Sequence, residues 1–202
     1  MELSQLQQQA ITKRKATHEI APWILGRWSP RAMSGEALTD VELLPLFEAA
    51  RWAPSSFNGQ PWRFLYAKRD TPEWNIFYNL LGDWNKAWTA KASVLILAVG
   101  RKNFEHNEKP SRTHGFDTGA AWENLALEGA QRGLVVHGME GFDYDRARTE
   151  LHVPDAFEIF AMIAVGKPGE KDDLPDNLRE IEEPSNRRPL AEMVKEGIFW
   201  NS

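Results

Sequence analysis

A continuous apolar run, SVLILAVG at residues 93–100, is the feature that most limits how this chain can fold. The run is far too short to cross a bilayer as a helix, and its lack of alternation suits a strand that is buried on both faces. Segments 62–68 and 157–166 also have strand composition, and a shorter strand begins at residue 135 and runs into a turn. We therefore expect a sheet that contains strand 93–100, with apolar cover on both faces of that strand.

Helical patterns occupy much of the sequence between these strands. Thr39 and Glu42 have the spacing of a capping box, and the apolar residues after them recur at helical intervals until the chain approaches Pro54. Pro45 removes one backbone donor inside this pattern. The sequence therefore predicts a helix that is either kinked at Pro45 or begins later than the capping box implies.

The clearest helix covers residues 116–134, where Gly133 is placed to end it and several small residues permit close packing against a neighbouring helix. Segment 71–91 begins as a helix and then becomes looser, and residues 143–151 predict a short helix. No internal repeat and no break in composition divides the chain. We expect one α+β domain over residues 1–202.

Both ends of this domain are polar. Residues 1–25 form an N-terminal extension, and residues 167–202 form a long segment punctuated by prolines. Neither has the apolar surface for a compact unit of its own. We expect them to be mobile or to wrap around other parts of the assembly.

The composition excludes several classes of function. The chain has 24 Lys and Arg against 29 Asp and Glu, and its formal net charge of −5 is too weak and too mixed to favour nucleic acid as a partner. It contains no cysteine, which excludes disulfides, a thiolate nucleophile and a Cys-ligated metal. The first residues lack the apolar region of a signal peptide, so we expect a cytoplasmic protein without membrane association.

Nine tryptophans stand in a chain whose mean hydropathy is −0.50. Much of the apolar surface is therefore concentrated in a few large rings. Such rings can fill a core, line a flat aromatic ligand or form a subunit interface. The sequence leaves these alternatives open.

The common catalytic and metal-binding motifs are absent from the sequence. No G-x-S-x-G motif surrounds Ser55 or Ser56, which favours turn or capping hydroxyls over nucleophiles. Neither G-x-x-x-x-G-K nor G-x-G-x-x-G occurs, so those phosphate-binding loops are excluded. Residues 103–117 match no metal-ligand spacing and favour a solvated loop, and we expect no metal site from their ionisable side chains, which are Glu105, His106, Glu108, His114 and Asp117.

Four motifs occur in one order along the chain: RWSPR at 27–31, APSSFNGQPWRF at 53–64, GMEGFD at 138–143 and RRPLAEMV at 187–194. Together they resemble the nitroreductase family of flavin-dependent oxidoreductases, and the resemblance extends from about Arg27 to the C-terminus. It implies a nitroreductase-like α+β fold, with a central, mostly antiparallel sheet flanked by helices, in an intertwined homodimer. The C-terminal segment 167–202 would then wrap the partner subunit.

The resemblance also implies an activity. The protein would bind FMN at the subunit interface, oxidise NAD(P)H and reduce nitroaromatics, quinones or related small acceptors in a ping-pong cycle. The flavin carries this chemistry, so no catalytic side chain is required. The alternative is a flavin-binding or degenerate protein of the same fold that has lost turnover.

By the same resemblance, the RWSPR motif holds the cofactor. Arg27 would bind the FMN phosphate, Ser29 the phosphate or the ribityl chain, and Arg31 the pyrimidine edge of the flavin. Arginine suits bidentate phosphate recognition, and a fixed positive charge at the pyrimidine edge stabilises negative charge on a reduced flavin. Trp28 belongs to the same motif, although its ring by itself is better suited to the core or an interface.

The remaining predicted cofactor residues come from four places in the sequence. Asn85 would form a hydrogen bond with the flavin ring, and Arg187 would bind the phosphate. The backbone amides of Glu140 and Gly141 would lie beside flavin N5 and O4, with Met139 just before them. The other subunit would contribute Pro54, Ser55, Ser56, Asn58 and Gln60.

Two positions depart from the family pattern. Ser185 stands where many members have a basic residue, so one phosphate contact is missing or is supplied by Arg188. Trp88 stands where some members have a lysine near the flavin. His137 precedes the predicted N5 loop, and as a histidine at a strand end it favours a structural role over proton donation.

Overall fold

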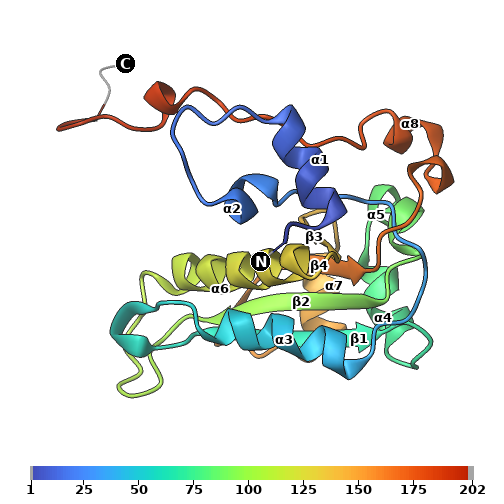
Figure 1. Cartoon of the computed structure of the whole chain (residues 1–202). Coiled ribbons are helices and arrows are strands. Elements are labelled where there is room, and N and C mark those ends of the chain that lie inside the picture. The colour runs from blue at the N-terminus through green and yellow to red at the C-terminus, as the bar shows by residue number, and fades with distance from the viewer. Residues whose placement is uncertain (1, 200–202) are drawn as a thin grey trace.

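The computed structural model describes residues 2–199. This part of the chain contains eight α-helices and four strands, which Figure 1 shows in their spatial arrangement. Their bounds, in chain order, are α1 Gln5–Lys13, α2 Pro22–Gly26, α3 Asp40–Arg51, β1 Trp62–Lys68, α4 Trp74–Leu80, α5 Asp83–Thr89, β2 Val94–Arg101, α6 His114–Gln131, β3 Val135–Met139, α7 Tyr144–Glu150, β4 Phe157–Gly166 and α8 Asp176–Arg179.

The strands described form one antiparallel sheet in the order β1-β2-β4-β3. The register of β2 against β4 shifts between Ala98 and Val99, so an irregularity lies at the centre of the sheet. The predicted fold class is confirmed: the sheet is antiparallel and helices flank it (Figure 1). The intertwined dimer remains a prediction.

Strand β2 is buried on both faces, as its sequence predicts. Leu95 and Leu97 pack into an apolar cluster with α4, α5 and α7, whereas Ile96 and Ala98 pack into a second cluster with α3 and α6. Each of these four side chains is at most 2% exposed. The sheet is therefore the middle layer of three, and β2 connects its two cores.

Local signals set the bounds of α3 and α6. Helix α3 begins directly after Thr39, whose capping box with Glu42 forms as predicted, and it continues through Pro45 to Arg51. Helix α6 is followed by Gly133, whose φ of +75° is the left-handed conformation typical of a glycine after a helix. The later start that Pro45 left open is thus excluded.

Three helical segments differ from the sequence prediction. Residues 83–89, expected to be loose, form α5. The N-terminal extension contains α1, which begins with a capping box between Ser4 and Gln7. The segment after it contains the short helix α2. None of these helices has a long apolar face, which explains why periodicity did not reveal them.

The N-terminal helices α1 and α2 and the segment after β4 lie on one side of the sheet, above it in Figure 1. Helices α1 and α2 pack together there, and an ion pair of 2.9 Å joins Lys13 to Glu183 of the C-terminal segment. Among residues 2–199 no helix is both long enough and apolar enough to span a bilayer. The cytoplasmic location remains a prediction.

The close packing of α6 gives a first testable prediction. A Cβ at Gly129 would lie 2.3 Å from Cγ2 of Val136, which is buried in β3, so Gly129→Ala overpacks this contact. We expect the free energy of unfolding to fall by about 1–3 kcal/mol in urea titrations.

Gly119→Ala is the matched control on the same helix, since nothing lies within 4 Å of a Cβ there. In a helix interior alanine is favoured over glycine by about 0.5–1 kcal/mol, so this variant should be as stable as the parent or slightly more so. Equal loss in both variants would contradict the packing of α6 described above.

Candidate functional site

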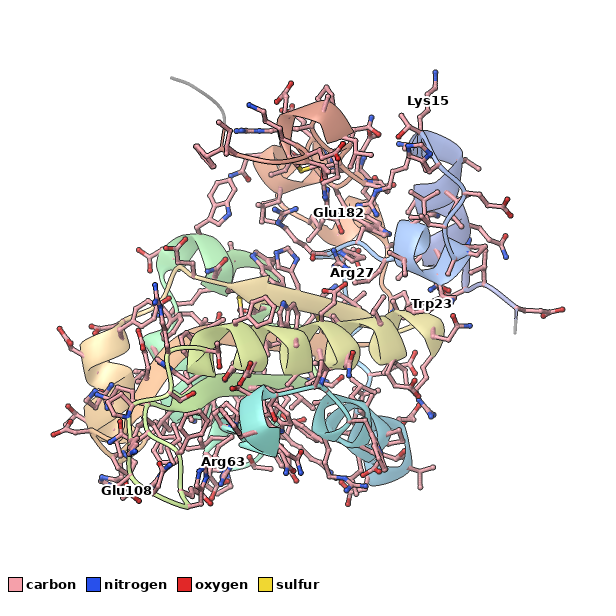
Figure 2. All side chains as sticks on the ribbon, turned by 90° about the vertical axis from the view of Figure 1, so that its left-hand side faces the viewer. Lys15, Trp23, Arg27, Arg63, Glu108 and Glu182 are labelled. Carbon is pink, nitrogen blue, oxygen red and sulfur yellow. The ribbon has the colours of Figure 1, made fainter. Side chains whose placement is uncertain are left out.

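Arg27 and Ser29 lie directly after α2 and line a cavity of about 360 Å³. Nη1 of Arg27 is 3.4 Å from the Ser29 hydroxyl, and its Nε is 3.4 Å from a carboxylate oxygen of Glu123 on α6. Met139 and Glu140, at the end of β3, line the same cavity. The fold thus brings the RWSPR and GMEGFD motifs to one cavity although about 110 residues separate them. Figure 2 shows Arg27 where the sheet layers meet the terminal segments.

The turn after β3 leaves two backbone donors unused. The N–H groups of Glu140 and Gly141 donate no hydrogen bond to another residue of the described range 2–199, and both residues are exposed. Asn85 holds the turn in place, because its Nδ2 donates to the Gly141 carbonyl over 2.9 Å. The N–H of Gly82 donates to the same carbonyl over 3.0 Å. This arrangement offers two adjacent amides to an acceptor.

Gly141 has no room for a side chain at this turn. A Cβ there would lie 2.9 Å from the Asn85 amide nitrogen that holds the turn. The predicted site residue Asn85 is therefore close to Gly141, and one donor of its side-chain amide is used by the turn. Asn85 acts here as a residue that positions the turn.

Arg31 is held by an acid that the sequence prediction missed. The carboxylate of Glu182 accepts the N–H groups of Arg31, at 2.5 Å, and of Ala32, at 2.9 Å, and it lies 3.4 Å from the Arg31 guanidinium. Glu182 is buried, at 6% exposure, and Nε of Arg31 is buried with no hydrogen-bond partner in the structure. The Arg31 guanidinium thus retains an unused donor.

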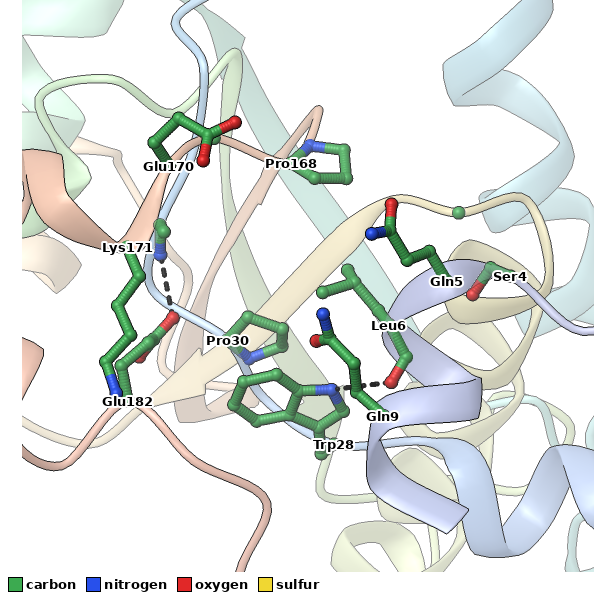
Figure 3. Close-up of a pocket in the computed structure, with 13 residues that line it drawn as sticks. Ser4, Gln5, Leu6, Gln9, Trp28, Pro30, Pro168, Glu170, Lys171 and Glu182 are labelled. Atoms are coloured by element: carbon green, nitrogen blue, oxygen red, sulfur yellow. Dashed lines mark hydrogen bonds between the residues drawn. The ribbon is translucent and has the colours of Figure 1, made fainter. Parts of the chain in front are cut away.

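Trp28 points away from Arg27 and Ser29. Its ring nitrogen donates to the Leu6 carbonyl of α1 over 3.1 Å, and the ring lines a different cavity of about 420 Å³ that also contains Glu182 (Figure 3). Its indole is 9% exposed and belongs to the core. This placement favours the core alternative for Trp28 over contact with a cofactor.

His137 and Trp88 pack against each other beneath the RWSPR segment. Their ring centroids are 4.6 Å apart, and Nδ1 of His137 lies 2.9 Å from the Pro30 carbonyl. Burial lowers the pKa of His137 to about 4, and the positive charges of Arg31 and Arg27 act in the same direction, while the Pro30 carbonyl opposes them. His137 is therefore a neutral imidazole at pH 7, in agreement with its predicted structural role.

The loop from Pro54 to Gln60 lies elsewhere on the chain. Phe57, Asn58 and Gln60 all have positive φ values, between 44° and 53°. The Ser55 hydroxyl accepts the Gln60 N–H over 3.1 Å. Because L-residues rarely adopt this conformation, the loop is strained, and such strain is often associated with function.

This loop does not meet Arg27 within one chain. Asn58, Gln60 and Arg63 line one cavity, and Arg27 and Ser29 line a different one. Figure 2 shows Arg63 and Arg27 well apart. The N–H of Ser56 donates to Asp117 of α6 over 3.1 Å, so Asp117, which the sequence suggested as a solvated group, orders the loop.

Arg187 lies in the C-terminal segment beside Ser185. Its Nη1 is 3.1 Å from the Ser185 hydroxyl and 3.2 Å from the Asn186 carbonyl. A guanidinium that the sequence prediction missed, Arg14, lies at the same segment and donates to the Ser185 carbonyl over 3.0 Å. No local pattern marks Arg14 or Glu182 in the sequence, because the contacts of Arg14 with Ser185 and of Glu182 with Arg31 join residues more than 140 positions apart.

Within residues 2–199 no group of three or more His, Asp or Glu side chains is arranged to hold a metal ion. His114 instead lies between the Ser111 carbonyl and the Glu158 carboxylate, at 2.7 Å from each. Both ring nitrogens of His114 thus have a hydrogen-bond partner within the chain.

Most of the chain matches one family of known proteins. Residues 24–80 and 68–167 match the model described as the Nitroreductase family. The chain belongs to the nitroreductase family. The match stops short of two parts that hold the site together, α1 with Arg14 and the C-terminal segment with Glu182.

Solved structures agree with this family assignment. A crystal structure of an oxidoreductase containing FMN is 43% identical, covers 94% of this chain and 97% of its own, and has a TM-score of 0.89. A putative nitroreductase from Desulfovibrio desulfuricans, crystallised in complex with FMN, is 28% identical, covers 88% of this chain and 95% of its own, and has a TM-score of 0.69. An uncharacterized 15.4 kDa protein of Mycolicibacterium smegmatis is 33% identical over 111 residues, which is 54% of this chain and 74% of that protein.

The lowered pKa of His137 predicts how the stability of this nitroreductase-family chain depends on pH. Between pH 6.5 and about 4 the unfolded chain binds a proton at His137 that the folded chain does not. Lowering the pH through this window therefore favours unfolding. From pH 7 to pH 5 we expect the parent to lose about 2 kcal/mol more unfolding free energy than His137→Gln, in urea titrations of both. Parallel pH profiles of the two proteins would contradict the neutral imidazole.

Proposed function

We propose that this chain is an FMN-dependent oxidoreductase that oxidises NAD(P)H and reduces nitroaromatics, quinones or related small acceptors in a ping-pong cycle. One observation carries the proposal. The cavity that holds Arg27 and Ser29 is also lined by Glu140, whose N–H and that of the adjacent Gly141 are unused, in a chain that is 43% identical to an FMN-containing oxidoreductase.

The residues present fit an FMN molecule. Arg27 and Ser29 offer charged and neutral donors to a phosphate or a ribityl chain. The two unused amides suit the acceptor atoms of a flavin ring, and the orphaned Nε of Arg31 offers a further donor. The Nε atoms of Arg69 and Arg101 are also buried without a partner, so the Arg31 donor supports the fit only together with the other donors of the site.

Bound FMN supplies the hydride and electron transfer itself, so the chain need only bind, orient and set the charge around it. The amides of Glu140 and Gly141 orient the ring, and Arg31 holds a positive charge whose position is set by Glu182. His137 is neutral at pH 7, so it adds no further positive charge next to Arg31 and Arg27. The residues that bind the cofactor also tune it.

A second candidate function is flavin binding without turnover. The observation that favours it is Ser185, which stands in the C-terminal segment where many family members have a basic residue. A weaker phosphate site lowers cofactor occupancy. Both candidates require FMN, and they differ in whether nicotinamide reduces it.

Flavin uptake followed by reduction tests the proposal. We expect the apoprotein to take up FMN, with flavin absorbance that remains after gel filtration. Under anaerobic conditions NADH or NADPH should bleach that absorbance, and a nitroaromatic or a quinone should restore it. FMN that stays oxidised with both nicotinamides would support the binding protein instead, and no uptake at all would contradict both candidates.

Within this proposal the flavin site is shared between two subunits, because the loop of Ser56 and Asn58 and the cavity of Arg27 do not meet within one chain. Mixed dimers test this. One variant carries Arg27→Ala and Arg31→Ala, and the other carries Ser56→Ala and Asn58→Ala. With random assortment each mixed dimer has one intact site, so co-expression should restore about a quarter of the parental FMN sites.

Each variant expressed alone is the control and should bind little FMN. Native mass spectrometry shows whether the mixed dimer forms. If it forms and FMN binding does not recover, the site lies within one subunit.

A further inference from the structure

Arg14 joins three segments of the chain at one point. It follows α1 directly, and its Nη1 donates to the carbonyls of Leu25, at 2.8 Å, and Arg27, at 2.6 Å. Its Nε donates to the carbonyl of Ser185 over 3.0 Å. The guanidinium is therefore held beside both the backbone of Arg27 and the C-terminal segment that carries Arg187.

The position of the Arg14 guanidinium is fixed, yet its charge is not neutralised by the protein. No carboxylate in residues 2–199 forms an ion pair with Arg14 or Arg187, and Nη2 of Arg14 donates to no acceptor in that range. Burial lowers the pKa of Arg14, and the positive charges of Arg187 and Arg27 lower it further. The guanidinium groups of Arg187 and Arg27 thus lie close enough to repel that of Arg14, and of the three only Arg27 has an ion pair in residues 2–199, with Glu123 at 3.4 Å.

Arg27 lines the cavity of about 360 Å³, whereas the other two guanidinium groups line a separate cavity of about 490 Å³. Arg14 and Arg187 line it, together with Lys15 and Arg188. Neither Lys15 nor Arg188 has an ion pair or a hydrogen bond with another residue of 2–199, and both are exposed. Arg14 differs from these two in being anchored by three backbone carbonyls, which lowers the entropy that it loses on binding an anion.

We propose that Arg14 supplies the positive charge that Ser185 lacks, and that it binds the phosphate of the cofactor together with Arg27 and Arg187. The inference rests on the proposed function, and it assigns the cofactor a contact from the N-terminal extension. The structural reason is that Nε of Arg14 donates a hydrogen bond to the Ser185 carbonyl. The Arg14 guanidinium therefore lies beside the uncharged Ser185 side chain. A dianionic phosphate satisfies the free Nη2 and relieves the repulsion among the three cations.

The comparison of FMN with riboflavin, which lacks the phosphate, tests this contact apart from activity. We expect Arg14→Gln to weaken FMN binding by about ten- to a hundredfold, since a charge-assisted hydrogen bond to the phosphate is lost. Riboflavin binding should change less than about threefold, because riboflavin offers nothing to that guanidinium. Both dissociation constants are measured by flavin fluorescence on the same apoprotein.

Lys13→Gln is the matched control. It removes one positive charge from α1 and breaks the 2.9 Å ion pair with Glu183, so it loosens the same two segments without touching the three guanidinium groups. We expect its FMN and riboflavin affinities to remain within about threefold of the parent. If Lys13→Gln lowers FMN affinity as much as Arg14→Gln does, Arg14 acts by docking the C-terminal segment, and the proposed phosphate contact is wrong.

A positive charge introduced at position 185 tests the proposed contact most directly. Ser185→Lys in the Arg14→Gln background should recover most of the FMN preference over riboflavin, because the lost charge returns next to Arg187. Arg14→Lys keeps the positive charge and should keep most of the preference for FMN. If Arg14→Gln does not fold, Arg14→Lys is the variant that tests whether the charge at position 14 binds the phosphate. Equal losses for FMN and riboflavin, or no recovery in the double variant, would overturn the inference.

FMN and riboflavin binding by the parent protein distinguishes a failure of this inference from a failure of the proposed function. If the parent binds FMN and prefers it to riboflavin, the proposed cofactor stands and the variants decide the role of Arg14. If the parent binds neither flavin, the proposed function itself fails and the inference fails with it.

Discussion

Burial of β2 on both faces is the constraint on which the rest of the structure depends. A strand with apolar side chains on both sides needs a helical layer on each, and here α3 and α6 cover one face while α4, α5 and α7 cover the other. With both faces of the sheet occupied, polar backbone groups remain open where elements end and turn. The unused amides after β3 and the RWSPR segment after α2 lie at such ends. The layered core therefore decides where a ligand can reach the backbone.

A buried carboxylate connects the C-terminal segment to this core, together with the buried side chains of Leu174 and Leu178. Glu182 accepts two backbone N–H groups, from Arg31 and Ala32, and lies beside the Arg31 guanidinium. Such a carboxylate is stabilised only because charged and dipolar donors surround it. Beyond Leu174 and Leu178 the segment after β4 buries few apolar side chains, so Glu182 is a polar anchor that adds to these two apolar contacts. The same anchor restrains Arg31, and it thereby couples the path of the C-terminal segment to the charge at the candidate site.

The candidate site is positively charged, whereas the whole chain carries a net negative charge. The protein is acidic overall, yet Arg14, Arg27, Arg31 and Arg187 lie around one region. His137 lies next to two of them and stays neutral, since burial and their charges together oppose its protonation. Arg27 and Arg31 are partly balanced by Glu123 and Glu182, whereas Arg14 and Arg187 have no carboxylate partner in residues 2–199, so the region is suited to a compact anion.

The sequence by itself determined what depends on neighbouring residues. The capping box of Thr39 and Glu42, the strand at 157–166 and the unbroken apolar run of β2 are local patterns, and each formed as predicted. The four motifs were also sufficient to indicate the family, which the family match confirmed. These features are readable because the physical cause lies within a few residues or within a short motif.

Only the tertiary structure decided which distant residues meet. Arg14 and Ser185 are separated by 171 positions, and Arg31 and Glu182 by 151, so no periodicity or spacing connects them. Trp28 belongs to the predicted motif, yet the packing of α1 turned its ring into the core. Long-range pairs such as these form because the folded layers bring remote segments together and every buried polar group needs a partner, a condition that cannot be read along the chain.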